Sequence, residues 1–213
     1  MNFVSKAVAG VGLTGSFAGG GYLIYIYNNK TTLEDRLLKD KFKILPLKAG
    51  KENNEGWSAV LTEYKKDTIP SQYKFSIPLD ATSDDANIEK LKTECSKVLS
   101  GKYSDSSYSK AKRWCVVVRS LKERLEDTGF RVLDNSEGSN NDDSEWIKKE
   151  SVYRDGDLSG IENDLTTAAG DKSKRKVAIK KGCKSLLEGD SKTFSDGFDD
   201  KYSKAEKLCA IRK

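Results

Sequence analysis

Hydrophobic and polar residues are distributed unevenly along the chain. Residues 7–27 contain no charged side chain, and a helix of that length spans the roughly 30 Å hydrocarbon core of a bilayer. Lys6 precedes the segment, and three tyrosines lie near its other end, where aromatic rings favour the membrane interface. The pattern predicts a transmembrane helix over residues 7–27, in a segment at 1–30 that anchors the chain in a lipid bilayer. A cleaved signal segment and a buried hydrophobic helix are the alternatives.

The rest of the chain has apolar residues at helical spacing. One apolar stripe runs from Ile88 to Leu99, and a second runs from Ser107 to about Asp127. Similar stripes recur near the C-terminus. Thr31 and Glu34 form a capping-box pattern that opens a further short helix. Alternating apolar side chains between Gln72 and Pro78 favour a short strand. We therefore expect a mainly α fold with minor β structure.

The second half of the chain repeats the first. The sequence YSKAKRWC, which starts at Tyr108 and ends at Cys115, returns as YSKAEKLC from Tyr202 to Cys209. Another cysteine precedes each motif, Cys95 in the first half and Cys183 in the second. A tryptophan stands further upstream in each half: Trp57 and Trp146. Three landmarks in one order at nearly equal spacing indicate a duplicated helical module.

A polar run marks the expected boundary between the copies. Residues 134–145 contain no apolar side chain and resemble a flexible acidic linker. The predicted organisation is a membrane anchor or signal segment at 1–30, a juxtamembrane helix with copy one at 31–133, the linker at 134–145, and copy two at 146–213.

Two interpretations of the four cysteines remain open from the sequence. They can be small buried hydrophobic residues, as free cysteine often is. They can also form one disulfide per copy, which the even count and matched placement favour. That pairing would join Cys95 to Cys115 and Cys183 to Cys209, and it would require an oxidising compartment.

Composition excludes several kinds of chemistry. The chain has no histidine, so catalytic triads and zinc sites that depend on histidine are excluded. The net charge is only +5, with acidic and basic residues intermixed, which argues against a nucleic-acid partner. The densest basic run, Lys172–Lys176, is interpreted as a solvated helix face. Residues 155–160 resemble the start of a calcium loop, but Thr166 stands where a bidentate glutamate is required. We expect no enzyme activity, no cofactor and no metal.

The chain also resembles a family. The Gly-rich apolar segment from Gly10 to Tyr27, the pair Gly56-Trp57, Cys95 and the pair Trp114-Cys115 are similar to features of the uncharacterised paralogous membrane and surface proteins of haemotropic mycoplasmas. Copy two departs from this pattern, because Leu208 replaces the tryptophan. The resemblance implies exposure at the cell membrane, membership of an expanded paralogous set, and no assigned enzymology. It transfers no functional residue.

These observations predict a non-catalytic, single-pass membrane protein whose module faces the cell exterior. Its expected partners are the lipid bilayer and a host protein or cell surface, in host contact or antigenic diversity. The alternative is a cytoplasm-facing structural or scaffolding protein that binds partner helices. Basic residues after the segment favour this second orientation, because the positive-inside rule counts Lys and Arg.

Overall fold

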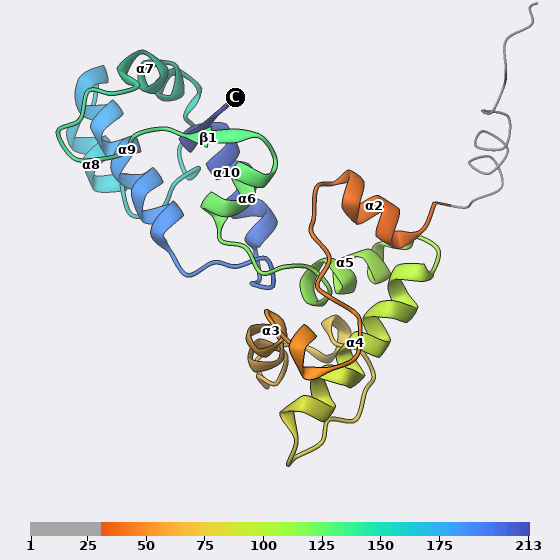
Figure 1. Ribbon diagram of the computed structural model, residues 1–213. Helices are drawn as coiled ribbons and strands as arrows, with labels where there is room; N and C mark the ends of the chain where they lie inside the picture. Colours follow the sequence, from red (N-terminus) through yellow and green to blue (C-terminus); the bar gives the residue numbers. More distant parts are fainter. Residues whose placement is uncertain (1–30) are drawn as a thin grey trace, which may run out of the picture. The chain divides into compact units, whose positions relative to one another are not determined.

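A computed structural model describes residues 31–213 and shows a mainly helical protein (Figure 1). The predicted membrane segment at 7–27 lies outside the described residues. Within 31–213, no helix combines the length and apolar character needed to cross a bilayer.

The first group of helices surrounds one hydrophobic core. These are α2 (Leu33–Lys39), α3 (Trp57–Tyr64), α4 (Asp84–Ser100) and α5 (Asp105–Trp114), with 3-10 turns at Lys51–Asn53 and Ser71–Tyr73. Leucines at the buried face of α2 pack with the tryptophans of α3 and α5 and with the apolar stripe of α4. This core belongs to the first copy of the module.

The remaining elements enclose a second core. They are α6 (Leu121–Asp127), β1 (Phe130–Val132), α7 (Asp143–Val152), α8 (Glu162–Thr167), α9 (Lys172–Glu188), α10 (Phe198–Cys209) and β2 (Ala210–Arg212). β1 and β2 form an antiparallel pair in which Arg131 lies opposite Ile211. Trp146 is fully buried in this core, together with the buried faces of α9 and α10. Figure 1 shows α7, α8 and α9 grouped with α10 and α6.

The two groups repeat the same succession of elements. Over most of the first group, each residue has its counterpart 88 positions later in the second group. Thr32 matches Ser120, and Cys95 matches Cys183. Both Thr32 and Ser120 form a capping box at the start of a short helix. The longest helices, α4 and α9, have the same length and the same type of N-cap, from Ser83 and its counterpart at position 171. The duplication therefore includes the segment before each tryptophan.

This correspondence moves the expected boundary between the copies. Copy two begins at Ser120, so α6 and β1 belong to the second core rather than to a first copy ending at 133. Residues 134–145 lie within copy two, as the counterpart of the loop between Pro46 and Trp57. They are held in place, because the Asp134 carboxylate accepts hydrogen bonds from Ser136, Ser139 and Asn141. The run without apolar residues at 134–145 is therefore a loop inside copy two, and not the linker between copies that its composition predicted.

Three local predictions also differ from the structure. The helix predicted from Ser107 to Asp127 is interrupted after Trp114, where Val117 donates to the Lys43 carbonyl at 2.7 Å in a short extended pairing. β-branched Val residues after Cys115 favour such extended structure. The strand predicted at 72–78 is a 3-10 turn followed by an irregular segment. The first capping box is formed by Thr32 and Asp35, one residue after the predicted position.

Candidate functional site

The four cysteines form one disulfide within each copy. Cys95 of α4 bonds to Cys115 at the end of α5, and Cys183 of α9 bonds to Cys209 of α10. In both bridges the Cα atoms are 5.5 Å apart, and all four side chains are fully buried. Each bridge links the long helix of a copy to the next long helix around the same core: α4 to α5, and α9 to α10.

The two landmark tryptophans also have matching roles. Trp57 and Trp146 are fully buried at the start of α3 and in α7. The indole N–H of Trp57 donates to the Pro46 carbonyl at 2.8 Å, and that of Trp146 donates to the Asp134 carbonyl at 3.0 Å. Positions 46 and 134 correspond in the two copies. Each tryptophan therefore fixes the chain that follows the first extended segment of its copy.

A buried lysine holds the next loop in each copy. The Lys92 side chain is only 2 % exposed. Its ammonium group donates to the carbonyls of Lys48 and Gly50, to the side-chain oxygen of Asn54 and to the Glu89 carboxylate. Its counterpart Lys180 donates to the Ser139 carbonyl at 2.6 Å. These ammonium groups satisfy loop carbonyls that would otherwise be buried without a donor. Lys92 lies four residues after Ile88 and three before Cys95, on the apolar face of its helix. This spacing is a signal of burial, although lysine is by type a surface residue.

The landmark tyrosines lie near the junction between the two copies. The Tyr108 hydroxyl donates to the Asp40 carboxylate at 2.7 Å, and the Tyr202 hydroxyl is 2.7 Å from the Thr128 hydroxyl. Burial raises the pKa of both phenols, and the Asp40 carboxylate raises the pKa of Tyr108 further. Asp40 and Thr128 occupy matching positions. Both tyrosines thus hold the end of the first helix of their own copy and remain protonated near neutral pH.

Arg124 joins the two copies at this place. Its guanidinium group lies 3.8 Å from the centre of the Phe42 ring and donates to the carbonyls of Asp40 and Lys41 at 2.5 and 2.6 Å. Lys41 donates in turn to the Thr128 carbonyl at 3.0 Å. The carbonyls directly after α2 and α6 are therefore each satisfied by a cation from the other copy. Burial lowers the pKa of Arg124, and no sequence motif identified this residue.

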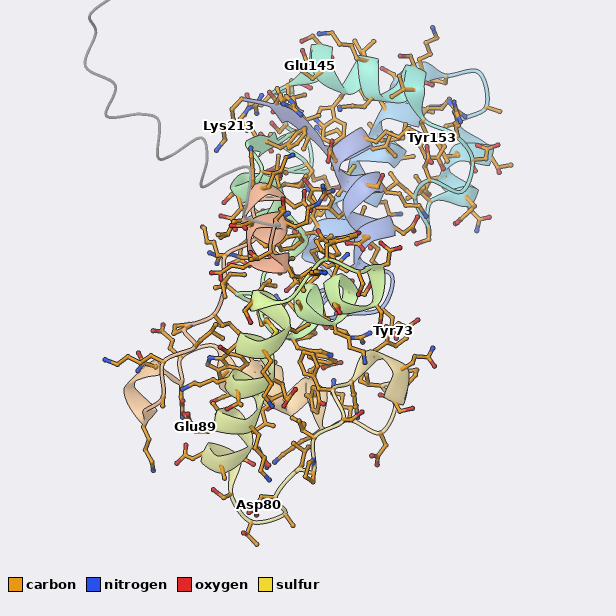
Figure 2. The ribbon with its side chains drawn as sticks, turned by 90° about the vertical axis from the view of Figure 1, so that its right-hand side faces the viewer. Tyr73, Asp80, Glu89, Glu145, Tyr153 and Lys213 are labelled. Carbon is orange, nitrogen blue, oxygen red and sulfur yellow. A yellow bond between two sulfur atoms is a disulfide. The ribbon has the colours of Figure 1, made fainter. Side chains whose placement is uncertain are left out.

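The surface has a hollow beside α4. It measures about 360 Å³, and it is lined by the apolar residues Ile77, Pro78 and Ala86 together with Glu89, Lys90, Thr93 and Glu94. Figure 2 labels Glu89 on α4 and Asp80 in the loop that leads into this helix. The α4 residues that line the hollow are spaced three or four apart, so they share one face of the helix. The hollow is the best candidate for a binding site on copy one.

The described residues do not assemble the other sites that sequence motifs suggested. No group of three or more metal-ligating side chains occurs within 31–213. In the calcium-like segment, Asp157 instead accepts from Lys207 and from the Arg154 backbone N–H. The cations at the end of the basic run are also paired, Arg175 with Glu150 and Lys176 with Asp143. The run is therefore part of an ion-paired surface rather than a concentrated positive patch.

Comparison with known proteins adds no family. The chain matches no protein-family model, no curated protein and no solved structure.

Proposed function

We propose that this protein is a non-catalytic binding module that a membrane anchor displays on the outside of the cell. The two buried disulfides, one in each copy, are the observation that carries the proposal. Structural disulfides persist in oxidising compartments and are rare in the cytoplasm. Small modules with modest cores are also the domains that depend most on such bridges.

Composition supports a display role over a catalytic one. Charged residues make up 33 % of the chain and apolar residues 36 %, so much of the module is a hydrophilic surface around two small cores. Without histidine, the chain lacks the commonest general base near neutral pH. We place the binding role in contact with a host protein or cell surface, or in antigenic diversity.

Membrane attachment rests on the uncharged segment at 7–27. This segment immediately precedes the module, whose first helix begins at Leu33. A single pass would then place the disulfide-bonded copies close to the outer face of the bilayer. The length of the segment and the redox requirement of the bridges together favour the exterior orientation, whereas the Lys and Arg residues after the segment favour the cytoplasmic one.

Protease shaving of intact cells tests the proposal. The cells are treated with trypsin or left untreated, and membrane fractions are then blocked with a thiol-alkylating reagent and separated on non-reducing and reducing gels. We expect the module to be digested from outside, to fractionate with membranes before digestion, and to show no alkylated cysteine. A module that is protected until lysis and carries four alkylated cysteines would overturn the proposal and favour a cytoplasmic scaffold.

A further inference from the structure

The duplication indicates what can occupy the hollow on copy one, because in copy two the chain itself covers the matching helix face. In copy two, the α9 face that contains Ala178 and Gly182 is covered by the segment leading into α8. Gly182 lies so close to Leu158 and Ile161 that an added Cβ atom would come within 3.0 to 3.2 Å of their side chains. Ala178 is buried, whereas its counterpart Lys90 is half-exposed.

Proline explains why copy one has no helix like α8 beside this face. The connections before α4 and α9 both contain nineteen residues, 65–83 and 153–171. Position 78 corresponds to Thr166, which lies inside α8. Proline removes a backbone donor and clashes with the preceding turn of a helix, so Pro78 prevents copy one from forming a helix like α8. The Pro78 carbonyl accepts a hydrogen bond from Lys90 at 2.7 Å instead.

The charge around the two matching faces is reversed. In copy two, Lys181 of α9 forms an ion pair at 2.7 Å with Asp164 of the covering helix. In copy one, threonine replaces this lysine and Glu94 replaces Gly182. Glu89 also lines the hollow, but its carboxylate is already paired at 2.9 Å with the buried Lys92. The only lysine in that lining, Lys90, directs its ammonium group to the Pro78 carbonyl.

We propose that the hollow binds a peptide segment of a partner protein that carries an apolar side chain and a Lys or Arg about one helical turn away. The apolar side chain would lie on Ile77, Pro78 and Ala86, as Leu158 and Ile161 lie on α9 in copy two. The cation would face Glu94, in the reverse of the Lys181–Asp164 pair. This inference deepens the proposed function, since it rests on the module acting by binding.

The Glu94 carboxylate can accept such a cation at low cost. Glu94 is bound at 2.7 Å by Lys97, but the side chain of this lysine is 66 % exposed. Surface ion pairs of this type contribute little stability, so an incoming cation can replace Lys97. Charge complementarity of this kind discriminates among partners more strongly than it raises affinity.

Selection from a library of random twelve-residue peptides tests the proposal with the purified, disulfide-bonded full-length chain in detergent micelles. We expect the enriched peptides to contain an apolar residue with Lys or Arg three or four positions away. Their binding, measured by fluorescence anisotropy, should weaken at least tenfold on Glu94→Lys. Glu145→Lys is the matched control, because Glu145 forms the same i,i+3 pair with Lys148 at 2.7 Å and has a similar exposure. This control should bind within twofold of the unaltered chain.

The proposal is overturned if no peptide is enriched, if the enriched peptides are acidic or lack basic residues, or if Glu94→Lys binds them as well as the unaltered chain does. Dimerisation of the chain that Glu94→Lys abolishes would assign the face to a second copy, and would also overturn it. Because the measurement uses purified protein, its outcome is independent of the side of the membrane on which the module lies. Protease shaving tests whether the module is displayed outside the cell, and peptide selection tests whether the hollow binds a basic peptide.

Discussion

Reduction of the disulfides should remove most of the stability of the protein. The bridges join cysteines 20 and 26 residues apart in the sequence, and closing loops of these lengths stabilises a protein by about 3 kcal/mol each in the chain-entropy model. Loss of both should therefore cost about 6 to 7 kcal/mol. Domains of ordinary size have a total stability of about 5 to 15 kcal/mol, so the reduced chain should be at or near the unfolding threshold.

The two bridges should also act separately, because each lies in its own hydrophobic core. The double variant Cys183→Ala and Cys209→Ala should accelerate hydrogen exchange in α9 and α10 more than in α4 and α5. The double variant Cys95→Ala and Cys115→Ala should have the opposite effect. Mass spectrometry of peptides from the exchanged protein resolves the two copies, and urea unfolding of the oxidised and reduced full-length chain gives the total change. A loss below about 1 kcal/mol per bridge, or equal effects on both copies, would refute the reasoning.

Three single substitutions test other contacts. Arg124→Met should lower the free energy of unfolding by about 2 to 3 kcal/mol, because two carbonyls lose a charged donor. Arg36→Met, at the matching and half-exposed position, should change it by less than about 0.5 kcal/mol, and similar urea midpoints for the two variants would contradict the prediction. Lys92→Met should lower the free energy of unfolding by about 2 kcal/mol and make the loop that the ammonium group binds more susceptible to limited proteolysis. Lys97→Met should leave the proteolysis pattern unchanged, and equal cleavage of the two variants would contradict the prediction. Burial raises the pKa of Tyr64 to about 12, whereas an unfolded tyrosine ionises near pH 10. The contribution of the protonated Tyr64 phenol to folding stability is therefore complete below pH 10 and is lost as the pH rises towards 12. Alkaline unfolding of Tyr64→Phe should accordingly show a shallower loss of stability across that window, and parallel curves would show that the ionisation of Tyr64 contributes nothing.

The helical elements and the paired landmarks could be predicted from the sequence, because their signals are local. Apolar residues at helical spacing predicted α4, and the same stripe with its cysteine predicted α9. Matching tryptophans and Tyr-Ser-Lys-Ala motifs revealed the duplication without any structural information. A cysteine on an apolar stripe is compatible with a free thiol or a bridge, however. Only the 5.5 Å approach of the two Cα atoms in each copy distinguishes these alternatives.

The start of copy two could not be located in the same way. Residues 32–45 and 120–133 share a capping box, buried leucines and a phenylalanine, but few identical neighbours. An acidic run was the more conspicuous feature, and nothing local distinguishes a loop held by hydrogen bonds from a flexible linker. The hydrogen bond from Trp146 to the Asp134 carbonyl, matched by that from Trp57 to the Pro46 carbonyl, places this run within the module.

Composition established a histidine-free chain of net charge +5 with intermixed charges, and the order of its residues predicted duplicated helices. Both can be read from the sequence because neither depends on what packs against a residue. Tertiary structure alone decided which of two matching arginines is buried, since Arg36 faces solvent and Arg124 binds the carbonyls of the other copy. It also decided that one α-helical face is covered while its counterpart is open. Burial is a property of what packs against a residue, and that neighbour lies far away along the chain.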